Sequence, residues 1–69
     1  MENNVYKKIE ITGTSSVSSD DAVNNALARA AKSVKNLRWF EVVETRGAIA
    51  EGNVQQWQVT IKVGFTMND

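Results

Sequence analysis

Cysteine and histidine are both missing from this chain of 69 residues. Without cysteine the chain has no disulfide, no thiol nucleophile and no thiolate metal site, and without histidine it lacks the commonest general acid–base group. A phosphate-binding glycine loop and a nucleophile elbow are missing as well. We therefore expect a binding protein and not an enzyme.

An excess of charge of one sign is also missing, since eight Lys and Arg balance eight Asp and Glu. A neutral chain has little electrostatic attraction for nucleic acid or anionic lipid, so we expect neither as a partner. No run of eighteen apolar residues is present, and residues 1–4 are not followed by an apolar run. These patterns predict no membrane span, no signal peptide and a cytoplasmic location.

The short length predicts a single domain over residues 1–69. A chain of this size buries only about 60% of the surface that its unfolded form exposes, so its own core is thin. Because disulfides and thiolate metal sites are excluded, we expect oligomerisation to supply the missing stability.

One helix is predicted in the first half of the chain. The stretch Ser18-Ser19-Asp20-Asp21 predicts its start, because a serine can cap the first free N–H groups and two aspartates suit the positive end of the helix dipole. Apolar residues at three- and four-residue spacing, most of them alanine, extend the helix from about Ser19 to about Lys35. Asn36 can end it.

Alternation of apolar and polar residues predicts three strands, and glycine and hydroxyl-rich stretches predict the connections between them. The expected segments, in chain order, are a strand over residues 5–12, a loop over 13–17, a strand from near Arg38, a turn at Gly52–Asn53, a strand over 55–65 and a frayed end over 66–69.

These elements predict the α+β class, in the order β-α-β-β, with a three-stranded antiparallel sheet packed on one helix. One helix can cover only one face of the sheet. We expect the alanine stripe of the helix to pack on the apolar side of the last strand, formed by Trp57, Val59, Ile61, Val63 and Phe65. The opposite face is then left for subunit contacts or a ligand.

Trp39 is the tryptophan that this arrangement leaves off the core face. Alternation places it on one side of its strand with Glu41, Val43 and Thr45, while Phe40 and Val42 point to the other side. Two interpretations stay open: an anchor in the core or in an interface, and a stacking platform for a flat ring system.

Gln58 and Arg46 are the polar candidates. The glutamine amide has an acceptor beside a donor, so it can pair with a heterocycle edge that presents N–H beside C=O, although an exposed strand residue fits the pattern too. Gln56 on the same face is a rival for that role. Arg46 is interpreted either as a ligand for a phosphate or an intersubunit carboxylate, or as a solvated charge.

A tight hairpin would place Gln58 opposite Gly47, eight residues along the strand from Trp39. At about 3.3 Å per residue, that separation is roughly 26 Å, which a three-ring heterocycle cannot bridge. If both residues serve one ligand, we expect them to come from different subunits.

Five stretches of the chain closely resemble the dodecin family. They are residues 5–7 and 10–15, the helix opening Ser-Asp-Asp-Ala, residues 36–42 and residues 58–65. The resemblance implies a β-α-β-β subunit assembled into a hollow dodecamer that binds flavin without a known reaction. It also implies that paired flavins stack between symmetry-related tryptophans at the position of Trp39, and that Gln58 contacts the flavin edge.

Arg46 and Ala48 match the bacterial type of that family, whereas the archaeal type has a glutamate in place of Ala48. The resemblance therefore implies FMN as the ligand, with riboflavin or FAD as alternatives, and coenzyme A is also associated with the bacterial type. The expected function is flavin storage and sequestration with quenching of photoreactivity. The alternative is an oligomeric binding or scaffold protein for another ligand such as coenzyme A.

Overall fold

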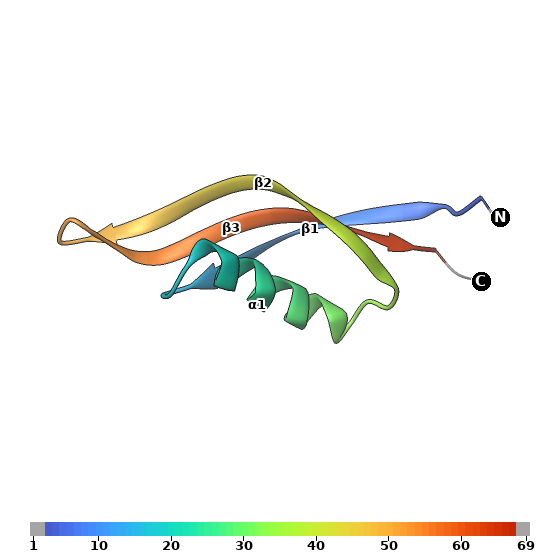
Figure 1. Ribbon diagram of the computed structural model, residues 1–69, viewed down its shortest axis with the longest axis horizontal. Helices are drawn as coiled ribbons and strands as arrows, with labels where there is room; N and C mark the ends of the chain where they lie inside the picture. Colours follow the sequence, from blue (N-terminus) through green and yellow to red (C-terminus); the bar gives the residue numbers. More distant parts are fainter. Residues whose placement is uncertain (1–2, 68–69) are drawn as a thin grey trace.

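The computed structural model describes residues 3–67 and contains one helix and three strands. In chain order these are β1 (Tyr6–Ser15), α1 (Ser19–Ala31), β2 (Leu37–Ala50) and β3 (Asn53–Thr66) (Figure 1). The strands form one antiparallel sheet in the order β1-β3-β2, so the last strand of the chain lies in the middle. The predicted β-α-β-β fold is confirmed.

The start of α1 agrees with the sequence pattern. The Ser18 side chain accepts a hydrogen bond from the Asp21 N–H at 3.0 Å, which satisfies one of the free donors of the first turn. The Ser15 hydroxyl donates to the Asp21 carboxylate at 2.6 Å and accepts from the Val17 N–H at 2.9 Å. These bonds join the end of β1 to the first turn of the helix.

The helix ends at Ala31 and not near Lys35 as predicted. The Ser33 N–H donates to the Ala30 carbonyl at 3.0 Å, a three-residue bond typical of a tightened last turn. Asn36 then adopts a positive φ of 67°, which turns the chain toward β2. Apolar spacing alone could not show that the chain has to turn at this point.

Strand β1 is longer than predicted, because the expected loop from Gly13 onward belongs to it as far as Ser15. Gly13 pairs with Val59 of β3. A Cβ at Gly13 would overlap the Ala22 carbonyl oxygen and the Ala26 side chain, so this glycine permits close packing of α1 on the sheet and does not make a turn.

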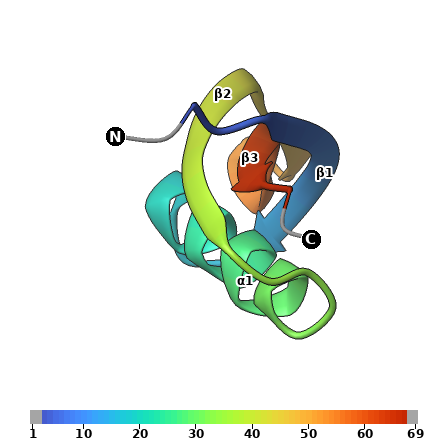
Figure 2. The ribbon, with the colours of Figure 1, turned by 90° about the vertical axis from the view of Figure 1, so that its right-hand side faces the viewer.

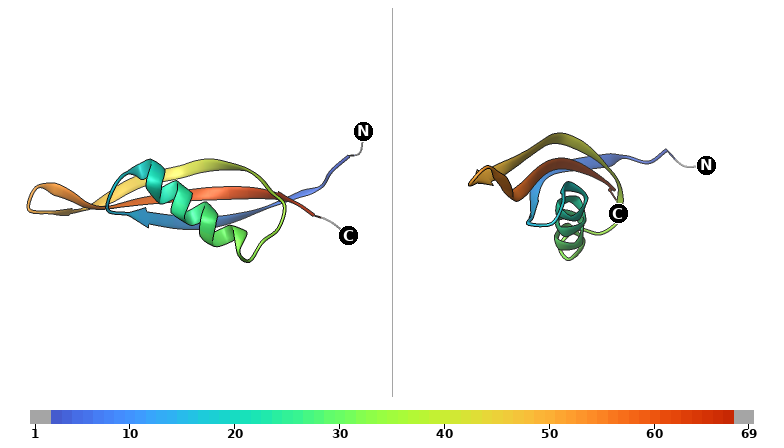
Figure 3. Two further views of the ribbon diagram at one scale, coloured as in Figure 1. Left: turned by 60° about the horizontal axis from the view of Figure 1, so that its bottom comes forward. Right: turned by 60° about the vertical axis from the view of Figure 1, so that its left-hand side comes forward.

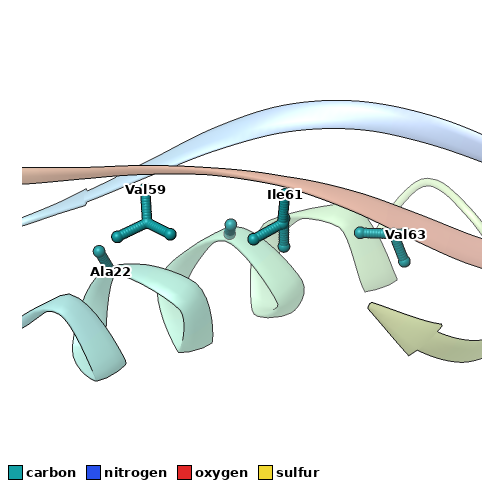
Figure 4. Packing of buried hydrophobic residues seen from close by; sticks show 5 residues of the cluster. Ala22, Val59, Ile61 and Val63 are labelled. Atoms are coloured by element: carbon teal, nitrogen blue, oxygen red, sulfur yellow. The ribbon is translucent and has the colours of Figure 1, made fainter. Parts of the chain in front are cut away.

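The core lies between α1 and the face of the sheet formed by β1 and β3 (Figure 2). Alanines of the helix meet the apolar side of β3, as the sequence predicts, and Figure 4 shows this layer from close by. Trp57 is half-buried and packs against it. The buried core residues are Ala22, Ala26, Ala30, Val59, Ile61 and Val63.

Strand β2 carries a bulge that changes which side chains share a face. The register shifts between Val42 and Glu44, so Val43 has no partner on β3 and the alternation moves by one residue. Thr45 pairs with Val59 and so lies on the helix side of the sheet. The prediction that Thr45 shares the face of Trp39 is wrong for this reason.

The β2–β3 hairpin also differs from the prediction. Its turn residues with positive φ are Glu51 (54°) and Gly52 (79°), as in a two-residue type I′ turn, and a further register shift lies between Ala48 and Ile49. Gln58 therefore pairs with Arg46, not with Gly47. The hairpin extends beyond the N-terminal end of α1 and contributes to the 53 Å length of the subunit (Figure 3).

The end of the chain, predicted to fray over residues 66–69, is ordered at Thr66 and Met67. Thr66 is buried and belongs to β3, and its N–H donates to the Asn36 carbonyl at 3.1 Å. The Met67 N–H donates to the Val5 carbonyl at 2.9 Å. Backbone pairing with two segments explains why these residues do not fray. Residues 68–69 lie outside the described part of the chain.

We expect Gly13→Ala to lower the free energy of unfolding by about 1–3 kcal/mol, because the added carbon overlaps helix backbone that cannot move without separating α1 from the sheet. Thermal unfolding followed by circular dichroism measures the effect. Thr14→Ala, at an exposed neighbouring position, is the control. Equal unfolding temperatures for the two variants would contradict the close-packing role of Gly13.

Candidate functional site

The face of the sheet that points away from α1 is called the outer face below. The pairing register assigns to it every second residue of each strand, in contrast to the core side chains on the opposite face. Its members that concern the site are Tyr6, Lys8, Trp39, Glu41, Arg46, Gln56, Gln58 and Gly64.

Trp39 lies at one end of the outer face, directly over the backbone of β3. It pairs with Gly64, and a Cβ at Gly64 would overlap Cζ2, Cε2 and Cη2 of the indole at nearly equal distances. Nearly equal distances to three consecutive ring atoms mean that Gly64 lies under the face of the six-membered ring and not at its edge. The indole is therefore packed flat on β3, yet it remains 39% exposed.

The Tyr6 ring contacts the same indole. The two ring centroids are 5.0 Å apart and the ring planes form an angle of 78°, an edge-to-face arrangement. Tyr6 belongs to β1 and Trp39 to β2, so the contact crosses the middle strand. A register shift between Leu37 and Trp39 precedes the indole and helps to direct it onto β3.

Three side chains form a hydrogen-bonded row toward the hairpin end of the outer face. Arg46 Nε donates to Gln58 Oε1 at 2.7 Å, and Gln58 Nε2 donates to Gln56 Oε1 at 2.9 Å. Because arginine has only donors, its contact fixes which end of the Gln58 amide is the oxygen. Gln56 is therefore hydrogen-bonded to Gln58, whereas the sequence presented it only as an alternative to Gln58 for contacting a ligand edge.

The row leaves Gln58 with unused hydrogen-bonding capacity. A glutamine amide offers two lone pairs and two N–H groups, and Arg46 and Gln56 occupy one of each. One acceptor position on Oε1 and one N–H of Nε2 remain available on a half-buried side chain. A ligand edge with N–H beside C=O has the complementary pattern.

An ion pair lies on the same face between the aromatic end and the polar row. Lys8 Nζ is 2.9 Å from Glu41 Oε1, and the pair crosses β3 next to Gly64. The hydrogen bond and charge of Lys8, with a smaller contribution from Lys62, lower the pKa of the Glu41 carboxyl from its ordinary value of 4.5. Both partners are exposed, so the pair adds little to stability.

Trp39 and Gln58 do not meet within one chain. The residue opposite Trp39 is Gly64, six residues from Gln58 on β3, which corresponds to roughly 20 Å at about 3.3 Å per residue. The bulges make this shorter than the predicted 26 Å but do not bring the two side chains together. The predicted site is therefore divided within a single subunit.

Apolar surface remains uncovered at two places beside this site. α1 lies against β1 and β3, and a groove lined by Val23, Phe40 and Val42 runs between the helix and β2. At the tip of the hairpin, Ile49 pairs with Val54, and Ile49 is 75% exposed. Apolar patches of this kind on a small subunit mark contacts with other chains.

Sequence reasoning did not identify Tyr6 and Gly64 as neighbours of Trp39. A glycine inside a strand often marks a close approach of another group to the backbone, so Gly64 carried a usable signal. Tyr6 carried no such signal. Its contact with Trp39 depends on the strand order β1-β3-β2, in which β1 and β2 are separated only by β3.

Within residues 3–67, no three His, Cys, Asp or Glu side chains come together in a group that could hold a metal ion. In the same part of the chain, the single helix is too short and too polar to cross a membrane.

Comparison with known proteins gives one consistent result. The model of the family described as Dodecin matches residues 5–68. The dodecin of Thermus thermophilus is 48% identical over 65 residues, which cover 94% of each chain. The structure of the dodecin of Streptomyces davaonensis has a TM-score of 0.94 at 44% identity, covering 99% of this chain and all of that one. A protein of Mycobacterium tuberculosis named calcium dodecin is 35% identical over 63 residues, 91% of this chain and 89% of that one.

We expect Lys8→Met to raise the pKa of Glu41 toward its ordinary value, because the charge and the hydrogen bond that lower it are both removed. Since the folded-state pKa is depressed, the pair stabilises the fold above the ordinary pKa of 4.5, and this contribution is lost as the pH falls through the folded pKa. An NMR titration of the Glu41 carboxyl, with Lys35→Met as the control, measures the shift. An unchanged titration in Lys8→Met would refute the assignment.

Proposed function

The chain belongs to the dodecin family, and from this premise we propose that it is a homododecameric flavin-storage protein. It stacks FMN, or the related flavins riboflavin and FAD, against tryptophans at subunit interfaces. Free oxidised flavin is photoreactive, and an indole in contact with it can quench the excited state by electron donation. The protein sequesters flavin in this way and catalyses no reaction.

The observation that carries this proposal is the way the Trp39 side chain is packed and exposed. Its indole is packed flat on Gly64 with one face toward the sheet, and it is still 39% exposed. An indole that is packed on one face and exposed elsewhere suits a stacking platform better than a core anchor. Trp57, by contrast, packs against the core from the helix side.

Gln58 complements this platform at the edge of the ligand. Its remaining donor and acceptor match the pyrimidine-like edge of a flavin, which presents N–H beside C=O. Arg46 uses only Nε in its bond to Gln58, and its two terminal nitrogens make no other hydrogen bond within residues 3–67. In this proposal Arg46 holds the Gln58 amide in place and offers those nitrogens to an anionic group such as the FMN phosphate.

The separation of Trp39 from Gln58 within one chain favours an assembly of several subunits. Because about 20 Å separates the two ends within one chain, Trp39 and Gln58 can contact one three-ring ligand only if they come from different subunits. The groove along Phe40 and Val42 and the exposed tip at Ile49 supply apolar surface for such contacts. The dodecamer implied by the resemblance is the form of assembly that we propose.

The alternative is an oligomeric binding or scaffold protein for another ligand, such as coenzyme A. The relative named calcium dodecin shows that at least one family member is named for a ligand that is not a flavin. Within residues 3–67 no cluster of metal-ligating side chains supports calcium for this chain. A dodecamer that leaves FMN fluorescence unchanged would favour the alternative.

We expect Trp39→Ala to abolish the quenching of FMN fluorescence and to lower FMN affinity at least tenfold, because the stacking surface is lost. Fluorescence titration with FMN measures both, and the mass of the assembly is determined on the same samples. Trp57→Phe is the matched control, since it removes a tryptophan from the core side and should keep the quenching. Unchanged FMN affinity in Trp39→Ala would reject the proposed function.

We expect Gln58→Ala to weaken FMN binding by about 1–3 kcal/mol, because the flavin edge loses its partner while its own polar groups stay buried. Gln55→Ala is the matched control, since Gln55 is exposed and is not part of the hydrogen-bonded row. If Gln56→Ala rather than Gln58→Ala caused the loss, the contact with the flavin edge would belong to Gln56.

A further inference from the structure

We infer that Tyr6 and Gly64 are positioning residues for Trp39, which together hold its indole so that a single ring face is open to a planar ligand. Gly64 supports one face of the indole and Tyr6 contacts it from the neighbouring edge strand. This inference rests on the proposed function, because it explains how the stacking platform is kept in one orientation.

Gly64 is the base of the platform. It lies in the central strand, where any side chain on the outer face would occupy the space that the indole fills. With no Cβ at this position, the six-membered ring can lie directly on the β3 backbone. A ligand cannot approach the indole from that side.

The absence of a side chain at Gly64 also allows side chains of the two edge strands, β1 and β2, to make contact across β3. Neighbouring strands lie about 4.8 Å apart, so residues of β1 and β2 are separated by roughly 10 Å across β3. Only long side chains span that gap, and only if the residue between them is small. Tyr6 pairs with Thr66 and Trp39 pairs with Gly64, so the two side chains meet diagonally across β3, and the missing side chain at Gly64 leaves room for their ring centroids to come within 5.0 Å.

Tyr6 limits rotation of the indole about its side-chain bonds. An edge-to-face contact has a preferred geometry, so the tyrosine favours the orientation in which the indole lies flat on Gly64. Tyr6 is itself 46% exposed and is not part of the core cluster. Its contribution therefore concerns the orientation of Trp39 more than the stability of the fold.

The single open face of each indole limits how a planar ligand can bind. Each tryptophan can stack on one flavin only, and a ring system has to approach from the side away from β3. A mobile indole would bind flavin in several orientations, and part of the bound flavin would then lie too far from the ring for efficient quenching.

The test compares Tyr6→Leu and Tyr6→Phe in the full-length assembly by FMN titration and by the fluorescence lifetime of bound FMN. Tyr6→Leu should raise the dissociation constant about two- to tenfold and add a long-lived component at saturation, because the edge contact is lost. Tyr6→Phe keeps the aromatic ring in contact with the indole and should behave like the wild type. Glu10→Gln, on the outer face of the same strand, is the control for surface changes.

A wild-type affinity and a wild-type lifetime in Tyr6→Leu would overturn the inference and leave the proposed function intact. Failure of the wild type to bind FMN would instead reject the proposed function. In that case the near-ultraviolet circular dichroism of Trp39, recorded in a Trp57→Phe background, decides on the positioning role. A loss of that signal in Tyr6→Leu supports the role, and an unchanged signal overturns it.

Gly64→Ala provides a second, independent variant. Its added carbon overlaps the ring, so the indole has to leave the sheet, and both the Trp39 dichroism and the quenching of FMN should fall even where Tyr6 is present. If Gly64→Ala kept both at wild-type levels in a folded assembly, Gly64 would not be the base of the platform.

Discussion

The close approach of α1 to the sheet is the constraint on which the rest of the subunit depends. Gly13 has no side chain where the helix backbone passes, and small alanines of the helix face Val59 and Ile61 of the central strand. Small residues on both sides bring the two layers near enough for a thin core to be well packed. A chain of this length has little other apolar material with which to build one.

The same constraint explains why the subunit is incomplete on its own. A single helix placed close to β1 and β3 leaves a groove beside β2, and the hairpin tip extends past the helix altogether. The apolar residues there, such as Phe40 and Ile49, stay exposed because no element within residues 3–67 covers them. Self-association would cover this surface and would also unite the two halves of the proposed site.

The central strand β3 organises the site from the other face. It contributes Gln58 to the hydrogen-bonded row and Gly64 to the aromatic end, and both edge strands send side chains across it. The Lys8–Glu41 ion pair spans the strand in the same region as the Tyr6–Trp39 contact. Contacts from both edges therefore meet over one strand, where backbone pairing on each side holds it in place.

Local patterns in the sequence predict the order of elements, a serine cap on the helix, the core face of β3 and the separation of Trp39 from Gln58, because periodicity and capping are encoded within a few residues. The end of α1, the extension of β1 through Gly13, the bulge at Val43 and the pairing of Gln58 with Arg46 could be learned only from the three-dimensional structure. Each of these depends on a partner distant in sequence. The Tyr6–Trp39 contact is the clearest example, since it requires three strands and a glycine between them.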